Sequence, residues 1–247
     1  MYIGQHLTYQ VSSVNVIDVK VNDAVERSVR SADPERAPQS LSESAYISLR
    51  DQLITLKIRP GEPIDEKLQA STLNIGRTPV REALKRLEAD RLVVSYPRRG
   101  TFASDVKISD LALISAIRIK LEPYAAQRAA MQAETQHGAE LRKLLEEIEA
   151  EPAGHDDADA LIDLDLQVHR AIYRAAGNPF LEEILIRHYH LVVRIWGLFV
   201  DRLPRFPEHA DEHLRLVQAI LKGDANESEN LARQHVLSFE AAIRSVI

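Results

Sequence analysis

Residues 75–102 form the stretch IGRTPVREALKRLEADRLVVSYPRRGTF. Its first part places Val80, Ala83, Leu84 and Leu87 at the spacing of one helix face. A proline stands in the first turn, where no backbone donor is needed. The second part has strand composition on both sides of PRRG, which is typical of a β-hairpin. The stretch therefore predicts a helix followed directly by a hairpin.

Two more helices are expected upstream of this stretch. Ser40 and Glu43 have the spacing of a helix-capping box, and leucines and alanines recur at helical intervals as far as Leu56. The segment RPGEP then ends the first helix, and a short helix is expected over residues 65–72. Three helices and a hairpin in fewer than 70 residues predict a winged helix-turn-helix, which we place at residues 41–107.

Polar residues of the third helix, expected over 78–90, lie at its beginning and away from its apolar stripe. A recognition helix presents its first turn to base edges in the major groove, where an arginine binds guanine O6 and N7 with two hydrogen bonds. The turn of the hairpin carries two more arginines, which suit contacts to phosphate. An alternative is that Arg77 and Arg81 are solvated helix charges, with Arg81 paired to Glu82 or Glu88. The expected contacts to DNA are Arg77, Thr78, Arg81, Arg98, Arg99 and Gly100.

Composition limits the class of protein. The 247 residues include no cysteine, which excludes disulfides and thiolate metal sites. No apolar run approaches the roughly 20 residues that cross a bilayer, and the N-terminus lacks the pattern of a signal peptide, so we expect a cytoplasmic protein. The net charge is −6, but residues 41–107 hold 12 lysines and arginines against 9 acids, whereas residues 108–247 hold 15 against 23. A basic N-terminal module on an acidic body permits a nucleic-acid contact at one end.

The rest of the chain is expected to be helical. Breakers at Gly138 and at residues 151–157, 177–179, 203–207 and 222–224 delimit six segments with apolar spacing near that of a helix. We therefore expect a mainly α protein in which residues 108–247 form an all-helical bundle of about six helices. Residues 1–40 are expected to form a poorly ordered tail.

Three histidines and an aspartate of this bundle could bind a metal. Asp165 and His169 are four residues apart and project from one helix face, while His213 and His235 lie on separate helices at positions that face inward. Together they could converge on one divalent cation. The alternative is a set of hydrogen-bonded core histidines, with Asp165 paired to Arg170 or Arg174.

The N-terminal motifs PGEPIDE, RTPVREALKRLE and PRRGTF resemble the DNA-binding domain of the GntR family of bacterial transcription regulators. The resemblance implies that Arg77, Thr78 and Arg81 read operator bases, with Arg50 and the Arg99–Gly100 pair assisting at the backbone and the wing. Three positions depart from the family pattern: Gly76 replaces a serine, Gln69 replaces a leucine, and Arg91 replaces a glycine after the recognition helix.

The C-terminal motifs IRIKLEPYAAQRAA, DLQVHRAIYRAAGNP, DEHLRLVQAI and GDANESENLARQH resemble the FadR-type C-terminal (FCD) effector domain of many GntR proteins. In the metal-binding branch, one Asp and three His hold a divalent ion, and they correspond to Asp165, His169, His213 and His235. Zinc, nickel and manganese all suit such ligands. The resemblance also implies that Arg118 receives the carboxylate of an effector, whereas its spacing from Glu122 alone would indicate a surface pair.

The function that follows is a ligand-responsive regulator and not an enzyme. We expect a homodimer that binds a palindromic operator, represses a catabolic or transport operon, and responds to a small organic or sugar acid. Two alternatives stay open at this point: a metalloenzyme built on the three histidines and the aspartate, and a DNA-binding protein whose metal is purely structural.

Overall fold

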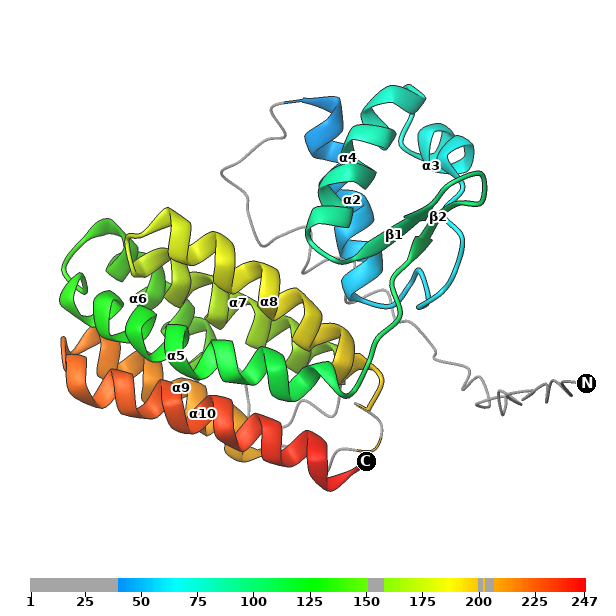
Figure 1. Cartoon of the computed structure of the whole chain (residues 1–247). Helices are drawn as coiled ribbons and strands as arrows, with labels where there is room; N and C mark the ends of the chain where they lie inside the picture. Colours follow the sequence, from blue (N-terminus) through cyan, green and yellow to red (C-terminus); the bar gives the residue numbers. More distant parts are fainter. Residues whose placement is uncertain (1–39, 151–157, 200–201, 203–206) are drawn as a thin grey trace, which may run out of the picture.

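The computed structural model describes residues 40–150, 158–199, 202 and 207–247. The chain is mainly helical, with a winged helix-turn-helix at the N-terminal end and a helical bundle after it, as predicted (Figure 1). Apart from Ser40, the tail predicted over residues 1–40 lies outside the described residues. The boundary between residues 107 and 108 stays a prediction.

The first helix is shorter than its apolar pattern predicts. Helix α2 spans Leu41–Ile54 and begins, as expected, with the Ser40 hydroxyl accepting from the backbone N–H of Glu43. Leu56 was expected to continue it, but that residue has a φ of +58° and lies beyond the helix end. Burial explains the exception, because Leu56 is only 5% exposed and packs against the bundle near Gly197.

The next two helices form the helix-turn-helix. Helix α3 (Glu66–Thr72) is capped by Asp65, whose carboxylate accepts from two backbone N–H groups. Helix α4 (Arg77–Ala89) follows Gly76, which provides no side-chain cap. Helix α4 buries the predicted apolar stripe against α2, so its first-turn arginines are left at the surface.

The wing is the predicted antiparallel hairpin. Strand β1 (Val93–Tyr96) pairs with β2 (Gly100–Ala103), and the register places Tyr96 opposite Gly100. The hairpin needs left-handed backbone at two positions: Arg98 in the three-residue turn has a φ of +62°, and Gly100, which begins β2, has one of +96°. The turn therefore presents its two arginines outward.

The bundle contains the six helices that the sequence predicts. They are α5 (Asp110–Met131), α6 (Gln136–Ala150), α7 (Ala158–Ala175), α8 (Pro179–Gly197), α9 (Pro207–Leu221) and α10 (Ala225–Ser245). Asn178 caps α8 and Asp224 caps α10, but residues 151–157 and most of the 203–207 breaker lie outside the described residues. The prediction that Gly138 separates two helices is wrong. Gly138 lies in the first turn of α6, where a β-carbon would collide with the carbonyl of Ala133.

Helix α5 contacts four of the other bundle helices, and α10 packs along it (Figure 1). Pro123 lies inside α5 and cannot donate to the carbonyl of Ile119. Arg233 of α10 provides a donor in its place, with Nη1 3.3 Å from that oxygen. This contact helps to hold α5, which carries two residues of the site described below, in register with α10.

Helix α8 connects the bundle to the winged helix-turn-helix. It packs against α2, and Arg187 of α8 forms an ion pair of 2.9 Å with Asp90, the residue that ends α4. Arg194, farther along α8, donates to Ser104, directly after β2. The two parts of the chain are thus joined by polar contacts from one helix. None of the helices in the described ranges is long and apolar enough to cross a membrane.

Candidate functional site

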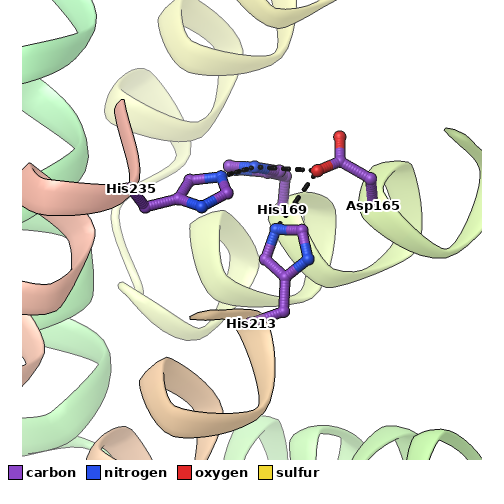
Figure 2. Close-up of side chains that lie close together, drawn as sticks. All are labelled: Asp165, His169, His213 and His235. Carbon is purple, nitrogen blue, oxygen red and sulfur yellow. Dashed lines mark hydrogen bonds and ion pairs between the residues drawn. The ribbon is translucent and has the colours of Figure 1, made fainter. Parts of the chain in front are cut away.

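Three helices bring the four predicted metal ligands together in the bundle. Asp165 and His169 come from α7, His213 from α9 and His235 from α10, and all four side chains are buried (Figure 2). One ligand atom from each lies within 4.8 Å of the others. Oδ1 of Asp165 is 3.1 Å from Nε2 of His213 and 3.6 Å from Nε2 of His169, and the Nε2 atoms of His169 and His235 are 3.1 Å apart.

Two neighbouring side chains orient the histidine rings. The Tyr173 hydroxyl donates to Glu122 at 2.8 Å, so its oxygen is left to accept from Nδ1 of His169 at 3.0 Å. Nδ1 of His235 is 2.9 Å from a carboxylate oxygen of Glu212. Both contacts place the proton on Nδ1 and direct the lone pair of Nε2 toward the centre of the cluster, as metal-binding histidines require.

Tyr173 and Glu212 belong to the site but were not predicted from the sequence. Tyr173 is four residues after His169, so helical spacing could have indicated it. Glu212 is next to His213 in sequence but contacts His235 on another helix, and no local pattern reveals that pairing.

Burial keeps His169 in the form that binds a cation. Desolvation lowers the pKa of His169 well below its usual value, although Asp165 and Glu122 act in the opposite direction. His169 is therefore neutral near pH 7, which is the state that donates a lone pair. One carboxylate and three imidazoles, without thiolates, can hold zinc, nickel or manganese. The residues present thus fit a divalent ion without selecting one.

Arg118 lies in the same interior and is not a surface residue. Its side chain is 1% exposed and pairs with Glu122 one turn later on α5, so the alternative of a surface pair is wrong. Its guanidinium carbon lies 5.6 Å from the centre of the Tyr189 ring, and that ring is 4.5 Å from the ring of His169. Burial acts to lower the pKa of Arg118, but the charge of Glu122 and other nearby groups raises it above the ordinary value, so Arg118 stays cationic.

The predicted base-reading residues occupy one exposed surface of the winged helix-turn-helix. Thr78 is exposed, and the side chains of Arg77 and Arg81 are 57% and 56% exposed. The alternative in which Arg81 pairs with Glu82 or Glu88 is wrong, because its carboxylate partner is Glu66 of α3. The arrangement leaves both guanidinium groups within reach of solvent at the N-terminal end of α4.

The other predicted DNA contacts lie in different surroundings. Arg98, Arg99 and Gly100 are exposed at the tip of the wing, with the Arg99 guanidinium 5.6 Å from the Tyr96 ring centre. Arg50 is only 15% exposed and pairs with Asp51. Burial lowers the pKa of His190 on α8, and the charge of Arg50 lowers it further. All of these contacts to DNA stay predictions.

Comparisons with known proteins match both parts of the chain. Residues 41–103 match the family "Bacterial regulatory proteins, gntR family", and residues 113–238 match the "FCD domain" family. The HTH-type transcriptional repressor RspR of Escherichia coli is 25% identical over 210 residues, which cover 84% of this chain and 91% of RspR. The galactonate operon transcriptional repressor of E. coli is 24% identical over 221 residues, covering 81% and 95%.

The fold is also that of a solved structure. E. coli McbR/YncC superposes with a TM-score of 0.73 at 24% identity and covers 83% of this chain and 98% of its own. The FCD match alone spans about half of the 247 residues, and the gntR match accounts for the winged helix-turn-helix. The chain therefore belongs to the gntR family of bacterial regulatory proteins with a C-terminal FCD domain, and it is a DNA-binding transcriptional regulator and not an enzyme.

Proposed function

We propose that this regulator represses a catabolic or transport operon and leaves its operator when a small carboxylate binds beside a divalent metal in the bundle. Zinc, nickel or manganese would be held by Asp165, His169, His213 and His235, one ion per subunit. Relatives that are named as repressors support repression as the mode of regulation. One of them is the repressor of a galactonate operon, which supports an organic or sugar acid as effector.

The observation that carries the proposal is a group of buried polar atoms next to the metal cluster. Nη1 of Arg118 has no hydrogen-bond partner within the described part of the chain, and the same holds for the hydroxyls of Ser115 and Tyr189. Ser115 precedes Arg118 by one turn of α5, and Tyr189 lies beneath its guanidinium. Unpaired buried groups are costly, so a polar ligand is the expected partner of all three.

Arg118 and the cluster would hold such a ligand at two points. A guanidinium binds a carboxylate through charge-assisted hydrogen bonds, and the hydroxyls of Ser115 and Tyr189 can bond to hydroxyl groups of a sugar acid. A divalent cation held by the four predicted ligands would add positive charge that attracts the carboxylate. The site thus favours small hydroxy acids over neutral or cationic compounds.

Helix α8 would transmit the effect of acid binding from the bundle to the winged helix-turn-helix. Tyr189 stacks near His169, and Arg194, five residues later, holds Ser104 beside the wing. A ligand changes DNA affinity only if it binds one arrangement of the recognition helices more tightly than another. Movement of α8 around a bound acid would alter the position of the winged helix-turn-helix.

A homodimer on a palindromic operator is part of the proposal. One recognition helix reads too few base pairs to select an operator, and two-fold symmetry doubles the contacts. The acidic bundle offers a surface for pairing, since apolar residues are exposed along α5 and at the start of α8: Leu113, Ile117, Tyr124, Phe180 and Ile184. Light scattering at micromolar concentration should give twice the mass of the 27.8 kDa chain. A monomer that still binds a palindrome tightly would contradict the dimer.

The function is tested by a screen of acids against operator binding. DNA that the protein selects from a random library serves as the operator, and fluorescence polarisation follows its release. Hydroxy acids and sugar acids should release it from the metal-loaded wild type but not from Arg118→Ala or the bulkier Arg118→Met, both of which should keep the metal. If every acid leaves operator affinity unchanged, the metal is purely structural and the effector proposal is wrong.

A further inference from the structure

One carboxylate joins the two arginines at the start of the recognition helix. Oε2 of Glu66 on α3 accepts from Nη2 of Arg77 at 3.0 Å and from Nε of Arg81 at 2.8 Å. The Glu66 side chain is 26% exposed, so this three-residue cluster lies at the surface and faces solvent. Burial acts to raise the pKa of Glu66, but its bonds to Arg81 and Arg77 lower it, so Glu66 is charged at neutral pH.

We propose that Glu66 is the positioning residue for base reading: it holds Arg77 and Arg81 as one rigid pair and so sets the specificity of the regulator. The inference rests on the proposed role of these two arginines at base edges. An unrestrained arginine has many rotamers, and its ordering on binding lowers the affinity for DNA. A shared carboxylate fixes the direction of both guanidinium groups before DNA arrives.

The hydrogen bonds leave the reading atoms available. Arg81 uses Nε for Glu66, which keeps Nη1 and Nη2 for the two acceptors of a guanine edge. Arg77 uses Nη2 and keeps Nε and Nη1. Glu66 accepts from one nitrogen of each guanidinium group and leaves the other two nitrogens free for DNA. It can therefore stay in place while the arginines contact bases.

Glu66 also lowers the attraction to DNA of any sequence. Non-specific binding depends on the number of phosphates that positive side chains neutralise. A negative charge between two arginines reduces the net charge of this surface, so sequence-independent affinity falls while the geometry for the correct bases is kept. Both effects increase the ratio of specific to non-specific affinity, which is the quantity that matters in a genome.

Glu66→Gln provides the test, with Glu82→Gln as the matched control. Glu82 is exposed on α4 beside Arg81 and forms no ion pair or hydrogen bond with the residues that the structure describes, so its replacement removes the same charge without freeing an arginine. The full-length protein is titrated with the selected operator and with a scrambled duplex of equal length, at several salt concentrations. Circular dichroism and thermal melting verify that each variant is folded.

Glu66→Gln should bind the scrambled duplex more tightly and lower the specificity ratio about fivefold to thirtyfold, because two side chains must then be ordered on binding. Glu82→Gln should bind both duplexes slightly more tightly and keep the wild-type ratio. If Glu66→Gln keeps that ratio, the inference is wrong. The double variant Arg77→Ala, Arg81→Ala separates the two proposals: if it retains operator specificity, the base-reading role itself fails, and with it the role of Glu66.

Discussion

The guanidinium of Arg194 in the bundle is hydrogen bonded twice to Ser104 at the end of the wing. Nη1 donates to the hydroxyl of Ser104 at 2.6 Å, and Nη2 donates to its carbonyl oxygen at 2.7 Å. Burial lowers the pKa of Arg194 to about 10, although the charge of Asp105 acts to raise it. Arg194 is therefore charged at neutral pH and depends on Ser104 for its acceptors, which ties α8 to the wing.

Ser104→Ala should lower the free energy of unfolding by about 1–3 kcal/mol, because it leaves a buried charged donor without its acceptor. The hydroxyl also donates to the carbonyl of Arg91 at 2.7 Å, so the end of α4 loses a contact as well. Urea denaturation of the full chain measures the change. Ser95→Ala, which removes an exposed hydroxyl from β1, is the control and should change stability by less than about 0.5 kcal/mol. Equal stability of the two variants would show that the contact does not hold the domains together.

Arg91→Gly should stabilise the protein by about 1 kcal/mol. Arg91 has a φ of +62° directly after the end of α4, a conformation that costs an L-residue energy and that glycine adopts freely. The side chain is exposed, and the backbone carbonyl that accepts from Ser104 is kept. Thermal melting of Arg91→Gly beside Arg91→Ala measures the effect, and only the glycine should raise the midpoint. A lower midpoint for the glycine variant would mean that the arginine side chain contributes to stability.

Arg77→Ala and Arg81→Ala should each weaken operator binding by about 1–3 kcal/mol, because each removes a guanidinium group that forms two hydrogen bonds to a base. Arg98→Ala should weaken binding to every sequence and lower the slope of affinity against salt by about one charge. Gel shifts with operator and scrambled DNA separate the two kinds of loss. Unchanged operator affinity in the double variant of Arg77 and Arg81 would exclude α4 as the reading element.

Most of the fold could be predicted because its signals are local. The apolar stripe of α4, the PRRG turn and the cap at Asn178 depend on residues within a few positions of each other, and the structure has all three. Two predictions failed where tertiary packing overrides the local pattern. Leu56 leaves the helix to pack against α8, and Gly138 is needed inside α6 for its close approach to Ala133.

The candidate site could be predicted only in part for the same reason. Asp165 and His169 are one helical turn apart, and helical spacing placed His213 and His235 at inward-facing positions of two other helices. The family resemblance then implied that the four form one metal site. Side chains that orient a histidine ring from another helix could not be predicted, because they meet the ring only when particular helices pack together. Glu212 of α9, for example, contacts His235 of α10. The contacts of Glu66 with Arg77 and Arg81 join different helices, so the spacing of residues along one helix could not predict them either.

Glu212→Gln should lower the affinity for a divalent metal about tenfold to a hundredfold. The carboxylate accepts from Nδ1 of His235 and strengthens its ring as a ligand, and an amide does this less well. Calorimetric titration of the metal-free protein with Zn²⁺ or Ni²⁺ measures the change. Glu240→Gln, which removes a partly buried acid of α10 that pairs with Arg244 and not with a histidine, is the control and should bind as the wild type does. An equal affinity in both variants would exclude Glu212 as an orienting residue.

Release of DNA by an acid should require the metal cluster, and His213→Ala tests this link most directly. The measurement is the fraction of operator released by an acid that the screen identifies, at the concentration that half-releases the wild type. His213→Ala should keep its affinity for the operator but lose both the metal and the release. His188→Ala, which removes a histidine outside the cluster, should respond as the wild type does. Release from His213→Ala at the wild-type concentration of acid would contradict the account.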